Sequence, residues 1–335
     1  MKSELFTIPV LFVTFNRPDL TVISLSRILE ANPPKIYFFN DGPRIGNSND
    51  GVSCQAIRIL IDSMDYQGEF IPRFEEINLG CKNGVSTAIT WFFENEEMGI
   101  IIEDDILPTI DFFYYCQEML HLFRHDDRIF SISGCNLLNI FKEQENDYFF
   151  TNYPNIWGWA SWRRVWLLYD VAMSDWNNPE TRELVLQYLP TKEFRELKIA
   201  EFDSLVSGQN NTWDYQFYFS HLIHHALGIC PSKNLIENIG IDHKEAVHMI
   251  GDSPFSDLRH QGSITLPMKH NPIMVPDNEY AEKSIRKGYP YFYEIPVYPE
   301  PPKPNTSQKI SIAVGKMIGQ KGLLRYCINF VLGRK

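Results

Sequence analysis

The chain has 335 residues, of which 44% are hydrophobic and 14% aromatic, enough apolar material for one large packed domain or two small ones. Its formal net charge of −11 argues against nucleic acid as a partner, because phosphate backbones are bound by basic surfaces. The six cysteines are scattered, with no CxxC pair and no zinc-type spacing, so we expect no structural disulfide and a reducing compartment.

The N-terminal part of the chain alternates short apolar runs with helical patterns, which is typical of a parallel sheet with crossover helices. We expect strands at 8–15, 35–40, 70–77 and 99–103, and helices from Pro18 or Asp19 to about Leu29, over 51–64 and over 85–97. This order predicts a nucleotide-binding βαβαβαβ half. The amino-terminal run is too short to span a bilayer and has no signal-type cleavage site.

The fourth predicted strand ends in three adjacent carboxylates. Residues 100–102 are all isoleucine and predict a buried strand, and Glu103, Asp104 and Asp105 follow directly. In an open α/β sheet, ligands bind at the carboxyl ends of the strands. Massed carboxylates repel one another unless a positive group lies among them, and a divalent cation that bridges phosphates is a common solution. A solvated acidic turn is the alternative, and the apolar strand before the triplet favours the site.

The pattern changes in the second part of the chain. We expect a helix near 111–124, a strand at 129–134, an aromatic-rich segment from Tyr148 to Trp176, and helices at about 180–207 and 212–226. No flexible linker separates the parts, so we predict one continuous unit with two lobes. The predicted division is a nucleotide-sugar-binding half (1–110), an acceptor and catalytic half (111–266), a Pro-rich extension (267–300) and a basic tail (301–335).

Six short segments fit one known pattern in the same order. They are VTFNRP, FNDGP and EDDILPTIDFF at predicted strand ends, and WGWASW, NTWDYQF and NIGIDHKEAVH in the second half. Over most of residues 6–250 the chain resembles the GT-A nucleotide-sugar glycosyltransferases, and looks most like the N-acetylglucosaminyltransferase I type and related bacterial enzymes of surface-glycan assembly. The resemblance implies an α/β fold with a mostly parallel, Rossmann-like sheet flanked by helices. It also implies transfer of a sugar from a nucleotide-diphosphate donor to a glycan or lipid-linked glycan acceptor, as in lipopolysaccharide or capsule assembly.

The resemblance also implies roles for the acidic triplet. Asp105 would bind a Mn²⁺ or Mg²⁺ ion that bridges the donor diphosphate, Asp104 would face the ribose and the metal-bound waters, and Glu103 would face the donor sugar. Such an ion neutralises charge on a departing nucleoside diphosphate.

Three further residues match donor-binding positions more weakly. Arg17 and Asp41, at the ends of the first two strands, match positions that hold the base and the ribose. A surface salt bridge or a turn cap is the alternative for them. Lys82 either contacts phosphate or lies at the start of a helix without a ligand.

Sugar transfer removes a proton from an acceptor hydroxyl, and a carboxylate usually takes it in enzymes that invert the anomeric carbon. The resemblance implies that Asp214, in NTWDYQF, is this general base. The alternative is a helix N-terminal charge favoured by the macrodipole. Asp203, Asp175 and Asp170 are lesser candidates.

Two tryptophans and one histidine complete the predicted site. Trp157 and Trp159 are expected in a loop near the donor sugar, and Trp162 and Trp166 in the core, although the spacing of Trp159, Trp162 and Trp166 also fits one buried helix face. In the resembled family a segment here spanning Gly240–Gly251 closes over the donor phosphates, which selects His248. His243 or Lys244 is the alternative.

We therefore predict a metal-dependent, inverting glycosyltransferase of the hexosyltransferase class. A retaining enzyme on the same fold and an inactive nucleotide-sugar or glycan-binding protein are the alternatives. Residues 301–335 carry seven Lys or Arg and no acid, and within them 305–335 predict a basic amphipathic helix on an anionic membrane. A helix packed on the catalytic lobe is the other possibility. The predicted location is the cytoplasm, at the inner face of the cytoplasmic membrane.

Overall fold

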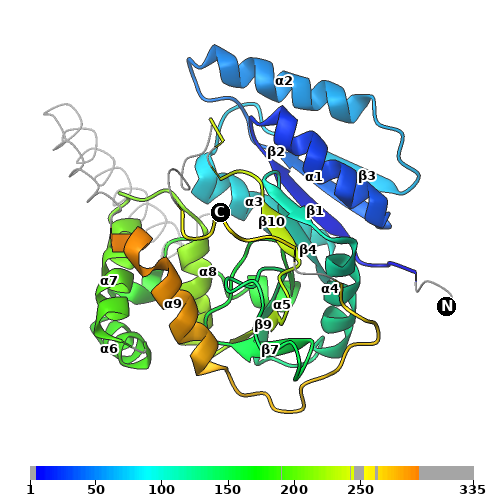
Figure 1. Ribbon diagram of the computed structural model, residues 1–335. Helices are drawn as coiled ribbons and strands as arrows, with labels where there is room; N and C mark the ends of the chain where they lie inside the picture. The colour runs from blue at the N-terminus through cyan, green and yellow to red at the C-terminus, as the bar shows by residue number, and fades with distance from the viewer. Residues whose placement is uncertain (1–4, 190, 242, 245–252, 261–262, 294–335) are drawn as a thin grey trace, which may run out of the picture. The chain divides into compact units, whose positions relative to one another are not determined.

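The computed structural model describes residues 5–189, 191–241, 243–244, 253–260 and 263–293 (Figure 1). The chain divides into two compact units, Met1–Ile295 and Pro296–Lys335. The second unit, and with it the predicted basic tail, lies outside the described residues. The first unit is an α/β fold built on one mostly parallel sheet with helices on both faces, which confirms the predicted fold class.

The central sheet has eight strands in the order β3-β2-β1-β4-β8-β6-β9-β7. Its strands are β1 (Val10–Thr14), β2 (Lys35–Asn40), β3 (Glu69–Phe74), β4 (Met98–Glu103), β6 (Ile129–Ser133), β7 (Tyr148–Thr151), β8 (Trp159–Trp162) and β9 (Leu227–Pro231). The first four strands pair in parallel, β8 runs antiparallel to both β4 and β6, β9 is parallel to β6, and β7 closes the sheet antiparallel to β9. A separate two-stranded sheet pairs β5 (Ile106–Pro108) with β10 (Ile236–Asn238).

Helices cover the sheet because its strands are apolar on both faces. Every residue of β1 is buried, as are Ile100, Ile101 and Ile102 of β4, which is the pattern of a sheet without a solvated side. The flanking helices are α1 (Pro18–Ala31), α2 (Ser48–Asp62), α3 (Gly80–Asn95), α4 (Ile110–Leu122) and α5 (Arg163–Trp166). Helix α1 packs against α2 and α4, and α3 packs against α5.

A group of helices forms a second lobe with its own small core. Its elements are η1 (Ser174–Asn177), α6 (Pro179–Tyr188), α7 (Lys192–Val206), α8 (Asp214–Ile223) and α9 (Asn278–Tyr293). Helix α8 packs against α6 and α7, and α7 packs against α9. Figure 1 shows α6, α7 and α9 gathered away from α1 and α2. The buried residues of this lobe include Trp176, Phe202 and Phe219.

Two expectations need correction. The predicted helix over 180–207 is two helices, α6 and α7, with a separate side-chain cap from Asn178 and from Thr191. The sequence carries Pro190 at the break, and proline removes a helical hydrogen-bond donor. Trp159 lies in strand β8 rather than in a loop, whereas Trp162 and Trp166 belong to the core as predicted. Helix α9 lies within residues 267–300, the predicted Pro-rich extension.

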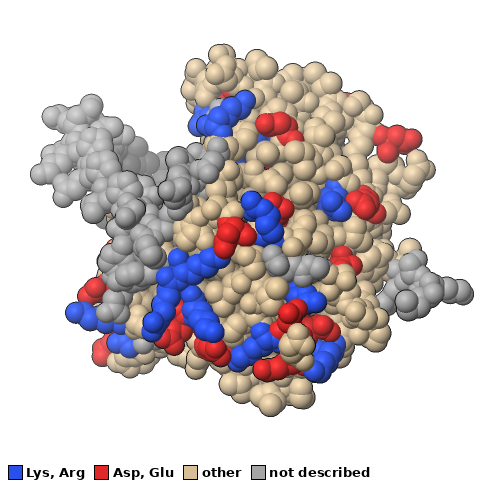
Figure 2. All heavy atoms as spheres, in the orientation of Figure 1, with Lys and Arg blue, Asp and Glu red and all other residues tan. Residues whose placement is uncertain are grey.

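The surface carries both signs of charge. On the face seen in Figure 2, acidic and basic side chains are interspersed. In the part of the chain that the structure describes, no helix combines the length and the apolar content that crossing a membrane requires.

Candidate functional site

The acidic triplet lies at the point where the sheet reverses its winding. The chain winds outward from β1 through β2 to β3 and then returns to place β4 on the other side of β1. Ligands of open α/β sheets bind beside the carboxyl ends of the strands at such a switch point. Arg17 follows β1 and is the N-cap of α1, and Glu103 is the last residue of β4. The fold therefore brings Arg17 and the triplet to the same crevice.

Arg17 forms ion pairs with two of the three carboxylates. Its Nη1 donates to Oδ2 of Asp105 at 3.0 Å, and its Nη2 and Nε donate to the two oxygens of Asp104, the second at 3.4 Å. The Asp104 side chain is 3% exposed and that of Asp105 is 21% exposed. The hydroxyl of Ser24 donates to the backbone carbonyl of Asp104 at 2.8 Å, which fixes the turn. A resident guanidinium thus provides the positive charge that the carboxylates require.

One guanidinium does not neutralise three carboxylates. Burial, followed by the charges of Asp105 and Asp104, raises the pKa of Glu103 to about 8, and Arg17 only partly opposes this. The charge of Asp214 adds to the same shift. Asp214, far away in sequence, therefore lies close enough to Glu103 for the two charges to interact, and the site has surplus negative charge.

The oxygens left over in this cluster determine how a metal ion would be held. Both oxygens of Asp104 face Arg17, whereas Oδ1 of Asp105 and the carboxylate of Glu103 accept no hydrogen bond from any described residue. Across the described ranges, no group of three or more His, Cys, Asp or Glu is arranged to hold a metal ion. Mg²⁺ at phosphate sites is usually held by one or two carboxylates together with substrate phosphates and waters. The residues present fit a cation shared with a diphosphate, and do not fit one held by protein ligands alone.

Gly240 closes one side of the cluster. Strand β10 pairs with β5 immediately after the triplet, and the backbone of Ile239 donates to the carbonyl of Asp105 at 2.8 Å. A Cβ on Gly240 would come within 2.5 Å of Cβ and 2.7 Å of Oδ2 of Asp105, and within 3.0 Å of Arg17 Nη1. Only glycine fits there without displacing both charged groups.

Asp41 is buried at the end of β2, where the protein itself uses both carboxylate oxygens. It accepts from the backbone amides of Gly42, Leu79 and Gly80 at 2.8, 2.9 and 3.2 Å, and from Asn78 Nδ2 at 2.8 Å. These bonds join the turn after β2 to the start of α3. The role of Asp41 that the contacts support is to shape this rim, and its predicted contact with the donor stays a prediction.

Lys82 lies in the first turn of α3, on the same rim. Its backbone amide donates to Asn211 Oδ1 at 3.3 Å. The loop before α8 therefore touches the start of α3, which joins the two lobes beside the crevice.

Asp214 is the first residue of α8. Its carboxylate accepts from the buried hydroxyl of Thr212, and no other described residue hydrogen-bonds it. The preceding Trp213 is 2% exposed and stacks on Trp159 with ring centroids 5.8 Å apart. This position fits the predicted base and also fits a helix N-terminal charge.

The lesser carboxylate candidates have other partners. Asp170 accepts from the backbone amides of Ala172 and Ser174 at 2.9 and 2.7 Å, and Asp203 pairs with Arg182. Asp175 lies in η1.

The aromatic and histidine candidates differ in burial and in their contacts. Trp159 is 1% exposed and packs on Trp213 and Phe217, so it has no free face for a sugar ring in this conformation. Trp157 is partly exposed and meets Phe255 edge to face. His243 Nε2 lies 3.1 Å from Asp19 Oδ2. His248 lies outside the described residues.

Sequence reasoning missed three contributors to this region. The backbone at Gly240 approaches Asp105 closely. Thr212 donates a hydrogen bond to Asp214, and Asn78 donates one to Asp41. The one available signal was a hydroxyl two residues before Asp214, a spacing at which a local side-chain bond is common.

No family model matches the chain. Three solved structures show partial similarity to the chain at low sequence identity. HddC from Yersinia pseudotuberculosis is 12% identical, with 47% of this chain and 77% of that chain covered and a TM-score of 0.31. A 4-diphosphocytidyl-2C-methyl-D-erythritol synthase from Anaerococcus prevotii is 9% identical, with 61% and 85% covered and a TM-score of 0.31. A putative glucose-1-phosphate thymidylyltransferase from Bacillus anthracis is 8% identical, with 62% and 85% covered and a TM-score of 0.31. Likeness at this level identifies neither a family nor a substrate, so the functional argument rests on the site.

Proposed function

We propose that the protein is a metal-dependent, inverting glycosyltransferase that moves a sugar from a nucleotide-diphosphate donor to a glycan acceptor of a surface polysaccharide. The observation that carries this proposal is the cluster at the switch point. Arg17 holds Asp104 and Asp105 in place, while Oδ1 of Asp105 and the carboxylate of Glu103 accept no hydrogen bond from the part of the chain that the structure describes. A negatively charged, partly unsatisfied carboxylate group at this place suits a cation that arrives with a diphosphate.

Within this proposal the residues divide into two sets. Asp105 and Glu103 would provide oxygens for Mn²⁺ or Mg²⁺, and Arg17 orients Asp105 through its ion pair. The bound cation would neutralise charge on the departing nucleoside diphosphate. Asp214, at the start of α8, receives the proton of the acceptor hydroxyl. At the same time the hydroxyl oxygen bonds to the anomeric carbon, and the bond between that carbon and the diphosphate oxygen breaks. Thr212 orients the Asp214 carboxylate, leaving its other oxygen for the proton.

Donor turnover tests the proposal directly. The full-length protein would be incubated with a panel of UDP-, GDP- and dTDP-sugars and Mn²⁺, and release of nucleoside diphosphate measured. We expect one donor class to be hydrolysed, with loss of activity in excess chelator. Donor binding without turnover, or chelator-resistant turnover, would contradict the proposal. Retention of anomeric configuration in the product would exclude the inverting mechanism and Asp214 as its base.

A further inference from the structure

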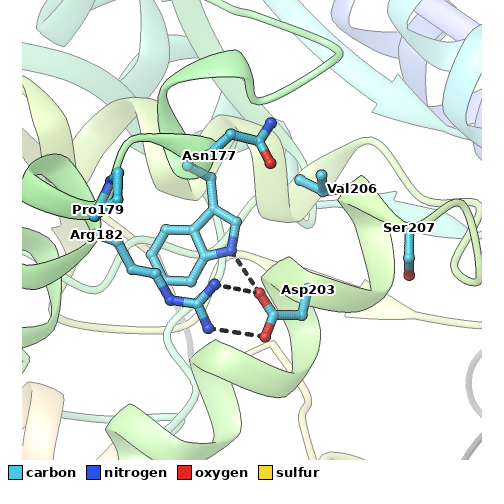
Figure 3. A pocket seen from close by; sticks show the side chains of 7 residues that line it. Asn177, Pro179, Arg182, Asp203, Val206 and Ser207 are labelled. Carbon is cyan, nitrogen blue, oxygen red and sulfur yellow. Dashed lines mark hydrogen bonds and ion pairs between the residues drawn. The ribbon is translucent and has the colours of Figure 1, made fainter.

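A pocket of about 410 Å³ opens in the helical lobe (Figure 3). Its lining includes Trp176, Pro179, Arg182, Asp203, Val206 and Ser207, from η1, α6 and the end of α7. None of these elements contributes a residue to the crevice at β1 and β4. The volume falls in the range of small-molecule sites in proteins, about 300 to 1,000 Å³.

The polar groups of this pocket are held in fixed positions. The guanidinium of Arg182 lies 4.5 Å from the ring centroid of Trp176. Its Nη1 and Nη2 donate to the two oxygens of Asp203 at 2.7 and 2.8 Å, and the indole Nε1 of Trp176 donates to the same carboxylate at 2.9 Å. Figure 3 marks the two hydrogen bonds between Arg182 and Asp203 with dashed lines. The stacked ring and the paired charges preorganise both side chains, which lowers the entropy cost of binding.

The chemistry of the lining selects a neutral polar ligand. Arg182 and Asp203 neutralise each other, so the pocket offers no net charge to an anion or a cation. Both remain accessible, with 35% and 47% of their side chains exposed. The guanidinium has further N–H donors and the carboxylate further lone pairs. Pro179 and Val206 provide apolar surface, whereas the Trp176 indole is 2% exposed and lies beneath the guanidinium, which it holds in place. An uncharged sugar complements this lining, because its hydroxyl groups both donate and accept hydrogen bonds and its ring has an apolar face.

The chain connects this pocket to the candidate base. From Ser207 the backbone runs through residues 208–213 to Asp214, and Asn211 on the way contacts the amide of Lys82 at the crevice rim. Seven residues span at most about 25 Å, so an oligosaccharide can reach both places.

We propose that this pocket is a secondary glycan-binding site, which holds a neutral sugar residue of the acceptor while another residue of the same glycan lies at Asp214. The assignment of that glycan as acceptor rests on the proposed function. The binding of a neutral sugar in this pocket does not depend on the proposed function.

Binding is tested on the full-length protein with chitotetraose, cellotetraose and maltotetraose as neutral probes and sialyllactose as a charged one. The indole N–H signal of Trp176, identified from a Trp176→Phe variant, reports on the pocket in the wild-type protein. We expect at least one neutral tetrasaccharide to shift this signal saturably, with a Kd below about 10 mM. Arg182→Met keeps the stem that packs on the ring and removes the donors, and should weaken binding about tenfold, or about 1.4 kcal/mol.

A matched control removes the same kind of group elsewhere. Arg128 pairs bidentately with Asp126 on the surface, and Arg128→Met should bind the probes as the wild type does. An unshifted Trp176 signal with every neutral probe, or equal affinity in Arg182→Met and Arg128→Met, would overturn the site.

The two proposals fail separately. Tetrasaccharide binding at Trp176 with no turnover of any nucleotide sugar would leave the pocket a glycan site and refute the enzyme. Turnover with an unmoved Trp176 signal would refute only the pocket.

Discussion

At the scale of single residues, Arg17 occupies the place where the sequence alone predicts a metal ion among carboxylates. The triplet itself was predictable, because an apolar strand that ends in acids marks a ligand-binding edge. The partner of the triplet was not. Nothing in the sequence tells that the side chain after β1 pairs with two carboxylates after β4, because these residues become neighbours only when the two strands pair.

Asp105→Ala should abolish turnover and leave the fold intact. The substitution removes a carboxylate oxygen that no described residue hydrogen-bonds, together with one ion pair of Arg17. Cation-dependent catalysis should therefore be lost without a buried cavity being formed. Nucleoside diphosphate release would be measured beside thermal unfolding. Asp126→Ala breaks a comparable arginine pair outside the site and should keep full activity. Wild-type rates in Asp105→Ala would exclude the metal role.

Asp214→Asn should keep donor affinity and lower the turnover rate by about 10² to 10⁴, because a general base typically contributes that factor. The alternative role, a charge at a helix N-terminus, is worth only about 0.3 to 1 kcal/mol of stability. Glu180→Gln removes an acid from the first turn of α6 and serves as the control. Equal turnover in the two variants would assign Asp214 to the helix terminus alone.

At the scale of elements, prediction succeeded in the N-terminal part of the chain, where short apolar runs alternate regularly with helical patterns. Strands β1, β2 and β4 and helices α1 to α4 were placed within a few residues, except that α3 begins earlier, because glycine at positions 80 and 84 hid its first turn. Strands β7, β8 and β9 were missed. They are as fully buried as β1, but no regular alternation with helical patterns surrounds them. A short apolar run without that context does not distinguish a strand from a buried helix turn.

The contact of α8 with β6 predicts a pH dependence of stability. His221 is 2% exposed, its Nε2 lies 3.2 Å from Ser131 Oγ, and burial lowers its pKa from 6.5 to about 3. Between these values the unfolded chain binds a proton that the folded chain excludes, so stability present above pH 6.5 is lost as the pH falls toward 3. We expect the free energy of unfolding to decrease by about 2 kcal/mol from this group between pH 7.5 and 5.

Chemical denaturation across that pH range measures the decrease, and NMR of the His221 imidazole identifies its source. An imidazole that remains neutral at pH 5 in the folded protein agrees with this account. An imidazole that protonates near pH 6.5 without loss of structure contradicts it. The variant His221→Gln should show a smaller slope than the wild type.

At the scale of the whole molecule, the basic C-terminus of an otherwise acidic chain predicts binding to anionic membranes. Residues 301–335 carry seven basic side chains and no acid, and each Lys or Arg near an anionic leaflet contributes about 1 kcal/mol. The full-length protein should float with anionic vesicles, and a chain ending at Pro304 should not. Neutral vesicles are the control. Equal recovery of the two proteins would exclude the tail as the anchor.

The single sheet through both parts of the chain limits how substrates enter and leave. Strand β4 is hydrogen-bonded to β8 over four residue pairs, from Met98 with Trp162 to Ile101 with Trp159. Swinging the two parts away from each other would break this ladder and expose its buried side chains, so the sheet has no hinge at this position. In the proposed enzyme we therefore expect the nucleotide to exchange through local movement near Gly240 and the loop before α8, which border the acidic triplet and the start of α3. Product release, where it limits the rate, will respond to substitutions in those two segments and not to substitutions along the strands.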